Sequence, residues 1–334
     1  MPRSFAPGRF ICLCNYVFII EGGLHTMTTK ETNEITGLTK LSDLNELAKK
    51  SGKKKVAVAV AHDEHCLEAV CAVMQKGIIN AILVGNEKKI NEIAAKLKLD
   101  LTNATIFNEE NDILAVKRAV KFVRDKEADI LMKGNVTSAT FLRGVLDKEQ
   151  GLRKSEVLSH FALFEVPTYH KLIGLTDAAM VIAPDLKTKV AIINNAVGFM
   201  NQLGYAKPKV AMLCAVEMVN EQMPATLEAA LIAKMNQRGQ IKNCIIDGPL
   251  AYDNCVSSES AKHKGIVSEV AGDADLLVAA DIEAGNALYK CWGFSANASL
   301  AAVILGAAAP IILTSRSDTE ESKQASIILA AAVN

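Results

Sequence analysis

The chain alternates between short apolar runs and longer amphipathic segments from about residue 54 onward, and this alternation restricts the folds open to it. KKVAVAVA precedes HDEHCLEAVCAVMQKG, NAILVG precedes NEKKINEIAAKLKL, and ADILMKG precedes NVTSATFLRGVL. Each short run is continuously apolar, as in strands covered on both faces, and each longer segment has a helical period of about 3.6 residues. The pattern predicts an α/β fold with a parallel sheet.

The rhythm changes around residues 155–180, where EVLSHFALFEVPTYHKLIGLTD is typical of two strands joined by a turn at Pro167. Alternation resumes with AAMVIAP, KPKVAMLCA, NCIIDGP, ADLLVAAD and PIILTS, so we predict a domain boundary near residue 150. The apolar run SLAAVILGAAAPIILTS is nearly long enough to span a membrane, but Gly306 and Pro310 interrupt it. We expect a buried helix, a turn and a buried strand there.

Composition excludes several classes of protein. Of the 334 residues half are apolar, enough to bury a large core, most simply as two domains. Lys and Arg number 37 and so do Asp and Glu, so no net field favours a nucleic-acid or membrane partner. The eight cysteines lie mostly in apolar runs without metal-ligand spacing, and we interpret them as reduced, buried thiols of a cytoplasmic protein.

The first 26 residues contain an apolar patch, Phe10 to Ile20, behind two arginines. This patch is too short to span a bilayer and lacks the small-residue cleavage site of a signal peptide. Met27 and a polar segment follow it. We therefore expect Met27 to be the natural first residue, and residues 1–26 to be a non-native or disordered extension.

Ligands of open α/β sheets bind outside the carboxyl ends of the strands, so the residues directly after each apolar run are candidates for a site. In MKGNVTSAT a lysine, a glycine and several hydroxyl groups lead into a helix N-terminus, which favours an anion such as phosphate. The segment lacks both nucleotide-binding glycine fingerprints. Taken alone, it is also explained by an ordinary helix cap at Thr137 or Ser138.

Two acidic segments have both a structural and a functional interpretation. HDEHC, from His62 to Cys66, could supply metal ligands, but a helix N-terminal turn explains it and no second ligand cluster is apparent. In DIEAGNALYK, Asp281 and Glu283 could cap a helix, with Gly285 easing close packing, or they could line a site. Composition does not decide between these alternatives.

The segment TSRSDTEES joins a buried strand to the last helix. Arg316 could bind phosphate with two hydrogen bonds, and the hydroxyl of Ser315 could donate to a developing oxyanion. Asp318 and Glu321 have the spacing of a capping box, which gives Glu321 a structural explanation as well.

Taken together, these segments resemble the phosphate acetyl/butyryltransferase family. The resemblance rests on MKGNVTSATFLRGVL, LSHFALFEVPTYHKLIGLTDAAMVIAPDL, DGPLAYDNCVS followed by HKGI, AGDADLLVAADIEAGNALYK and ILTSRSD. DGPLAYDN and TSRSD are more similar to the butyryl branch of the family than to its acetyl branch. The resemblance implies reversible conversion of butyryl-CoA and phosphate to butyryl phosphate and coenzyme A, with the CoA thiolate attacking the acyl phosphate directly in a ternary complex. Coenzyme A and phosphate are substrates, and no cofactor or metal is implied.

The resemblance also implies an architecture. The family has two α/β domains with a cleft between them, in an isocitrate/isopropylmalate dehydrogenase-like fold. We therefore predict a first domain of residues 27–150 plus 300–334 and a second domain of residues 151–299. A cytoplasmic homo-oligomer, at least a dimer, is expected on the same grounds.

Carried over by motif, Ser315 stabilises the oxyanion and Arg316 binds the anion. The acetyl branch has an aspartate base about six residues after this arginine, where this chain has Ser322, so the neighbouring Glu321 is our candidate base. The residues expected to contact substrate are Lys133, Gly134, Asn135, Thr137, Asp281, Glu283 and Asn286.

Three alternatives remain open at this stage. The first is a phosphate acetyltransferase. The second is an oxidative decarboxylase of the same general fold, which would need a metal site of carboxylates and a dinucleotide site. The third is a catalytically silent acyl-CoA-binding module, which the presence of Ser315 and Arg316 disfavours.

Overall fold

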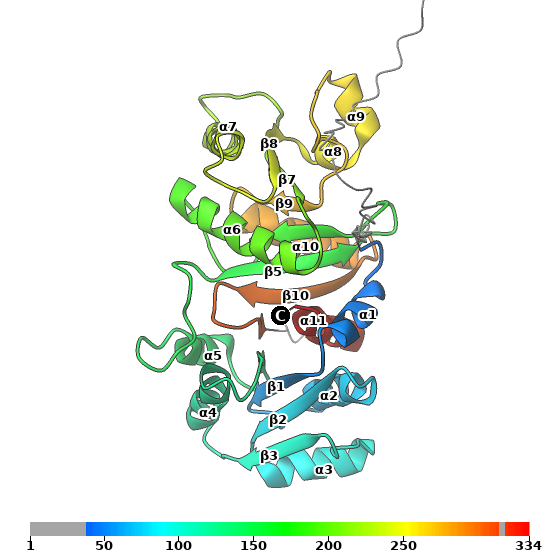
Figure 1. The fold of residues 1–334 in the computed structure, drawn as a ribbon, viewed down its shortest axis with the longest axis vertical. Coiled ribbons are helices and arrows are strands. Elements are labelled where there is room, and N and C mark those ends of the chain that lie inside the picture. Colours follow the sequence, from blue (N-terminus) through cyan, green and yellow to red (C-terminus); the bar gives the residue numbers. More distant parts are fainter. Residues whose placement is uncertain (1–37, 314–317, 334) are drawn as a thin grey trace, which may run out of the picture. The chain divides into compact units, whose positions relative to one another are not determined.

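The computed structural model describes residues 38–313 and 318–333, which form a mixed α/β fold around an 11-stranded sheet (Figure 1). The strand order is β3-β2-β1-β4-β11-β10-β5-β6-β9-β7-β8. The strands are β1 (Lys54–Ala59), β2 (Ile79–Gly85), β3 (Ala104–Asn108), β4 (Ile130–Lys133), β5 (Ser159–Glu165), β6 (Ile173–Thr176), β7 (Lys209–Leu213), β8 (Ile245–Leu250), β9 (Leu276–Val278), β10 (Ser299–Leu305) and β11 (Ile311–Ile312).

Helices connect these strands and cover both faces of the sheet (Figure 1). They are α1 (Asp43–Lys50), α2 (Glu64–Gln75), α3 (Glu87–Leu97), α4 (Asp112–Arg124), α5 (Ser138–Val145), α6 (Leu186–Gln202), α7 (Pro224–Gln237), α8 (Tyr252–Val256), α9 (Ser258–His263), α10 (Ile282–Phe294) and α11 (Glu320–Ala331). No helix in the described ranges is long and apolar enough to cross a membrane.

The first four strands pair in parallel, as their continuous apolar sequences predict. In β1, Val56 and Val58 join the core cluster on one face, whereas Ala57 and Ala59 join the cluster on the other. Both faces of this strand are therefore covered, which explains the absence of a polar alternation.

The middle of the sheet is antiparallel. β5 pairs antiparallel with β6, confirming the predicted pair of strands around Pro167, and β10 lies antiparallel between β5 and β11. As a consequence, β6, β9, β7 and β8 run opposite to β1–β4 and β11. The carboxyl ends of these two groups of strands therefore lie at opposite edges of the sheet.

Two secondary-structure predictions are wrong. Residues 299–305 form strand β10 rather than a buried helix, because a short apolar run has no distinguishing period and this one is paired on both sides. AAMVIAP is a loop rather than a strand. There the carboxylate of Asp177 accepts hydrogen bonds from the amides of Ala179 and Met180, at 2.8 and 2.9 Å, in place of strand pairing.

The hydrophobic core is continuous on one face of the sheet and divided on the other. On the first face, residues of α2, α11, α6 and β7 belong to one cluster. On the second face, one cluster lies under α4 and α5 and a separate cluster contains Phe164 and Trp292 of β5 and α10. The division runs through β10, where Ile304 belongs to the first of these clusters and Leu300 to the second.

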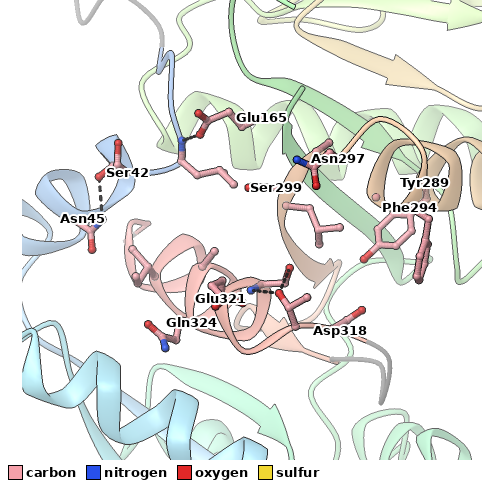
Figure 2. A pocket seen from close by; sticks show the side chains of 18 of the residues that line it. Ser42, Asn45, Glu165, Tyr289, Phe294, Asn297, Ser299, Asp318, Glu321 and Gln324 are labelled. Atoms are coloured by element: carbon pink, nitrogen blue, oxygen red, sulfur yellow. Dashed lines mark hydrogen bonds between the residues drawn. The ribbon is translucent and has the colours of Figure 1, made fainter. Parts of the chain in front are cut away.

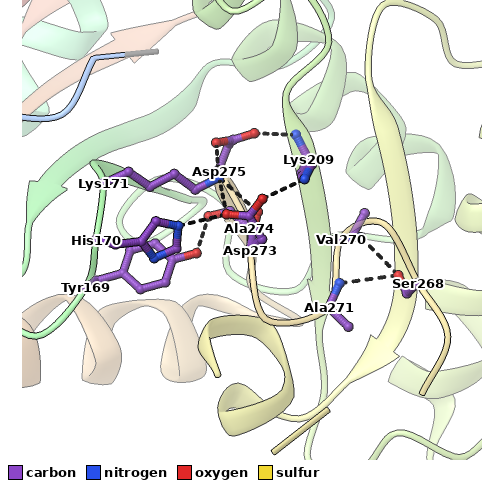
Figure 3. Close-up of polar contacts among 10 residues, drawn as sticks. All are labelled: Tyr169, His170, Lys171, Lys209, Ser268, Val270, Ala271, Asp273, Ala274 and Asp275. Atoms are coloured by element: carbon purple, nitrogen blue, oxygen red, sulfur yellow. Dashed lines mark hydrogen bonds and ion pairs between the residues drawn. The ribbon is translucent and has the colours of Figure 1, made fainter. Parts of the chain in front are cut away.

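Lysine side chains join three strand termini through a polar network (Figure 3). The amine of Lys171, before β6, lies 2.8 Å from a carboxylate oxygen of Asp273 and 2.6 Å from one of Asp275, both before β9. Lys209 of β7 forms an ion pair with Asp273 at 2.5 Å, and His170 contacts the same carboxylate at 2.8 Å.

All six cysteines within the described residues are free thiols. Four of them are buried as predicted, but Cys214 is half-buried and Cys291 is exposed on α10. Burial raises the pKa of Cys244 to about 11, so this thiol is protonated at neutral pH. Cys12 and Cys14 lie outside the described residues, as does Met27.

Candidate active site

A cavity of about 310 Å³ lies at the division between the two core clusters, and we call it the His160 cavity. It is lined by Ser138, Leu142, His160, Ala178, Ala179, Met180, Asn286, Tyr289, Lys290, Ala302, Ile304, Leu313 and Asp318. Residues of both α5 and α10 thus contribute to the lining of this cavity.

The sheet supplies one wall of this cavity. His160 of β5 is the register partner of Ile304 of β10, so the two side chains lie next to each other on the same face. Ala302 is two residues before Ile304 and points to the same face, and Leu313 follows β11. The antiparallel middle of the sheet therefore brings strands from distant parts of the chain to one site.

The loop after β6 and helix α10 supply the opposite wall. The side-chain amide of Asn286 donates to the carbonyl of Ala178 at 3.0 Å. One residue earlier, Gly285 lies so close to the loop that a Cβ atom would collide with the carbonyl oxygen of Asp177. The expected role of Gly285 in close packing is thereby confirmed.

His160 is a buried polar side chain on an otherwise largely apolar wall. Its exposed fraction is 7%, its ring packs edge-on against Tyr289 with centroids 5.5 Å apart, and its Nδ1 has no hydrogen-bond partner among the described residues. Burial, together with the nearby charge of Lys290, lowers the pKa of His160 to about 4. The imidazole is therefore neutral at pH 7.

Asp177 directly follows β6 and stabilises the conformation of the loop that begins there. Burial raises the pKa of its carboxyl group, whereas hydrogen bonds from backbone amides, including those of Ala179 and Met180, oppose this shift. Its Oδ2 atom is buried without a hydrogen-bond partner in the described part of the chain. The carboxyl group thus acts through the loop conformation rather than as a lining residue of the cavity.

A second cavity, of about 590 Å³, shares Tyr289, Lys290 and Asp318 with the first. We call it the Phe294 cavity; Figure 2 shows Tyr289 and Phe294 on one side and Glu321 and Gln324 of α11 on another. The amine of Lys290 lies 5.3 Å from the ring centroid of Tyr289 and 5.8 Å from that of Phe294. Such cation–π contacts hold the ammonium group at the junction of the two cavities.

The predicted catalytic pair, Ser315 and Arg316, lies outside the described residues. Leu313 and Asp318, which flank the undescribed residues, both line the His160 cavity. Glu321, the candidate base, is exposed in the first turn of α11 and lines the Phe294 cavity. The predicted capping box is wrong, because Thr319 is the N-cap of α11 and accepts from the amide of Ser322 at 3.2 Å.

The segment after β4 is an ordered helix cap. The amine of Lys133 donates to the carbonyls of Gly134 and Val136, both at 3.1 Å, and Thr137 caps α5 by accepting from the amide of Thr140 at 3.2 Å. At Gly134, any Cβ atom would collide with the carbonyl of Val60. Neither these residues nor Asn135 line the two cavities, but the adjacent Ser138 lines the His160 cavity.

At the start of α10, Asp281 is the N-cap and accepts from the amide of Ala284 at 2.8 Å. Glu283 is exposed in the first turn, and neither acid lines the two cavities. Asn286, one turn further, does line the His160 cavity. The tertiary structure therefore distinguishes the capping residues of this segment from the residue that faces a cavity.

HDEHC is likewise a helix start. Asp63 is the N-cap of α2 and accepts from the amide of Cys66 at 2.8 Å. Within residues 38–313 and 318–333, no group of three or more His, Cys, Asp or Glu side chains is arranged to hold a metal ion.

His160, Tyr289 and Lys290 were not among the residues predicted from the strand ends. His160 lies near the start of β5 rather than after its end, and Tyr289 and Lys290 lie in the second and third turns of a helix. One signal was present in the sequence, since His160 interrupts the apolar run of LSHFALF. A polar residue in a buried strand marks either a satisfied core position or a cavity, and only the contacts distinguish the two.

The chain matches the family model described as phosphate acetyl/butaryl transferase over residues 41–117 and 111–331. It is 49% identical over 280 residues to a phosphate butyryltransferase of Clostridium beijerinckii, covering 84% of this chain and 93% of that protein. It is 46% identical over 296 residues to that of Clostridium acetobutylicum, with 88% and 98% covered. The chain belongs to the phosphate acetyl/butyryl transferase family.

A phosphate acetyltransferase of Thermotoga maritima is also similar, at 44% identity over 294 residues, with 87% of this chain and 98% of that protein covered. Among solved structures, a branched-chain phosphotransacylase from Enterococcus faecalis superposes with a TM-score of 0.76 and 30% identity, covering 84% and 98% of the two chains. A 4-hydroxythreonine-4-phosphate dehydrogenase from Klebsiella pneumoniae has a TM-score of 0.50 at 12% identity, with 84% and 99% covered, and shows a likeness of fold alone.

Proposed function

We propose that the protein is a phosphate acyltransferase that converts butyryl-CoA and inorganic phosphate reversibly to butyryl phosphate and coenzyme A. The observation that carries this proposal is the 46–49% identity to two phosphate butyryltransferases over more than four-fifths of the chain. The His160 cavity, with an apolar wall and a few polar groups, is of the kind that binds a small ligand.

In the direction of acyl-CoA synthesis, the thiolate of coenzyme A attacks the carbonyl carbon of butyryl phosphate in a ternary complex. The carbonyl oxygen becomes an oxyanion, and its collapse expels phosphate. We assign oxyanion stabilisation to Ser315, binding of the phosphate to Arg316, and removal of the thiol proton to Glu321. The exposed position of Glu321 on the Phe294 cavity is compatible with transfer of that proton to solvent.

Lys133, Gly134, Asn135, Thr137, Asp281, Glu283 and Asn286 remain proposed substrate-contact residues. Of these, Asn286 has the most direct support, because it lines the His160 cavity and anchors the loop at Ala178. We further propose the two-domain arrangement, with residues 27–150 and 300–334 in one domain and 151–299 in the other. The pairing of β11 with β4 supports the return of the chain's end to the first domain.

We also propose that the enzyme works in the cytoplasm as a homo-oligomer and that coenzyme A and phosphate are its substrates, with no cofactor added.

The second candidate function is phosphate acetyl transfer, which the 44% identity to the Thermotoga maritima enzyme favours. The third is a silent acyl-CoA-binding module. One assay separates the three candidate functions. It measures phosphate-dependent release of free coenzyme A from acetyl-, propionyl-, butyryl- and isobutyryl-CoA, with and without a chelator. Fastest release from butyryl-CoA supports the proposal, fastest release from acetyl-CoA supports the second function, and binding without release supports the third.

Two substitutions test the catalytic assignments in the same assay. Ser315→Ala is expected to lower kcat by about 10²–10³-fold if its hydroxyl stabilises the oxyanion. Asn286→Ala is expected to lower turnover clearly but the free energy of unfolding only slightly, since Asn286 is exposed and anchors only a loop. Unchanged turnover in a folded variant would contradict the role of that residue.

A further inference from the structure

We propose that the His160 cavity is the acyl subsite, with the hydrocarbon chain against its apolar wall and the carbonyl oxygen beside the ring of His160. This inference rests on the proposed function and adds where the acyl group binds and which residues limit its length. It assigns a substrate contact to His160, a residue that the strand-end reasoning did not include.

The size and lining of the cavity suit a short acyl group. At about 310 Å³ it is near the lower limit of small-molecule sites, which span about 300–1,000 Å³. Its apolar wall is formed by Leu142, Met180, Ala302, Ile304 and Leu313. A complete acyl-CoA is much larger, so only its acyl end fits. The coenzyme A portion can extend toward the Phe294 cavity, which shares a wall with the His160 cavity.

The ring of His160 provides the polar group at this wall. A buried polar atom without a partner costs free energy, and such atoms are rare in folded proteins unless water or a ligand satisfies them. Nδ1 of His160 has no hydrogen-bond partner among the described residues and almost no accessible surface, so the ring meets the cavity that it lines with its other edge, which carries Nε2. A neutral imidazole has one N–H donor, which can hydrogen-bond to a carbonyl oxygen without adding a positive charge to the site.

Its neighbours strengthen this assignment. The amide of Asn286 is already engaged by the carbonyl of Ala178, and the amine of Lys290 lies over the rings of Tyr289 and Phe294. The ring of His160 therefore retains hydrogen-bonding capacity on a wall where these polar neighbours have other contacts. A purely structural histidine in this strand would be expected to have its ring nitrogens satisfied by the protein.

Two substitutions test the length limit. Ala302→Leu adds side-chain volume to the sheet wall and is expected to lower kcat/KM for butyryl-CoA at least tenfold while changing that for acetyl-CoA less than threefold. Met180→Ala enlarges the cavity at a half-buried loop position and is expected to favour pentanoyl-CoA over butyryl-CoA by about fourfold, the equivalent of one buried methylene. Ala287→Leu, at an exposed position of α10 that lines neither cavity, is the matched control.

A second pair of variants tests the polar contact. His160→Phe keeps an aromatic ring but cannot donate, and is expected to lower kcat about 10–100-fold for every acyl-CoA. His160→Asn restores a donor and is expected to recover at least part of this loss. Melting temperatures separate a lost contact from a lost fold.

The outcomes distinguish this inference from the proposed function. If the wild-type protein releases no coenzyme A from any acyl-CoA, the proposed function is wrong, and the inference with it. If the wild type is active but Ala302→Leu and Met180→Ala leave the chain-length profile unchanged, only the inference is overturned. The same holds if folded His160→Phe has wild-type kcat.

Discussion

At the scale of single residues, His160 shows how burial changes the chemistry of a side chain. Surrounded by the sheet and α10, it remains neutral under conditions in which an exposed histidine would begin to take up a proton. Its neutrality is therefore a property of the packed core, and it has a measurable effect on stability.

The folded state holds the pKa of His160 at about 4, whereas the ordinary value is 6.5. Above pH 6.5 the contribution of this group to stability is complete; below it, the unfolded chain binds a proton that the folded chain does not. We expect this residue to remove about 2 kcal/mol of unfolding free energy between pH 7 and pH 5. Urea titrations at the two pH values should show a smaller loss for His160→Phe than for the wild type.

The two glycines of α10 provide a second test at this scale. In Gly285→Ala, the new Cβ collides with the carbonyl of Asp177, and we expect a loss of about 1–3 kcal/mol in unfolding free energy. In Gly293→Ala, the nearest side-chain atom, on Leu300, is 3.9 Å away, so the change should be neutral or stabilising, as expected for alanine in a helix. Equal melting temperatures for the two variants would contradict the role of close packing at Gly285.

At the scale of elements, the ion-pair network joins the starts of β6, β7 and β9 (Figure 3). Burial acts to raise the pKa of Asp273, but hydrogen bonds from Lys171, Lys209 and His170 outweigh it and hold the pKa below its ordinary value. Parallel strands have no hairpins to align them, so this network fixes their starts relative to one another.

Lys171→Met tests the network. Lys171 is largely buried and contacts both Asp273 and Asp275, so its removal should cost about 1–3 kcal/mol of unfolding free energy. Lys187→Met is the control, because the Lys187–Glu156 pair is exposed on both sides and its loss should leave the urea midpoint unchanged. If both variants unfold at the wild-type midpoint, the network does not stabilise the sheet.

At the scale of the whole molecule, β10 ties the halves of the sheet together by pairing with β5 on one side and β11 on the other. The core cluster on the continuous face also contains residues from both halves, including those of α2 and α6. A chain joined in this way is expected to unfold in one cooperative transition.

The single tryptophan, Trp292, makes this testable. It is buried on α10, so its fluorescence reports on one half of the sheet, whereas far-UV circular dichroism reports on all helices and strands. We expect both signals to have the same urea midpoint. A fluorescence transition clearly separate from the circular-dichroism transition would show that the halves unfold independently.

Much of the fold follows from local patterns. Strands β1, β2 and β4 are predicted by continuous apolar runs, the helix start at HDEHC is predicted by residue type, and Thr137 and Asp281 are among the caps that residue type offered. Strand β3, by contrast, is half-exposed at the edge of the sheet and lacks such a run, so it was not predicted. β10 was predicted as a helix because a short apolar run fits both structures when its pairing partners are unknown.

The sequence by itself determined the α/β class, the family and the candidate motifs, because helical period, capping chemistry and motif wording are local properties of the chain. The antiparallel middle of the sheet, and with it the cavity that joins His160, Asn286 and Ala302, was decided only by tertiary structure. His160 is more than a hundred positions from Asn286 and Ala302 in the sequence, and it is brought to them by strand pairing and by the gap left between two core clusters. Neither the strand pairing nor the gap can be predicted from any single segment of the sequence.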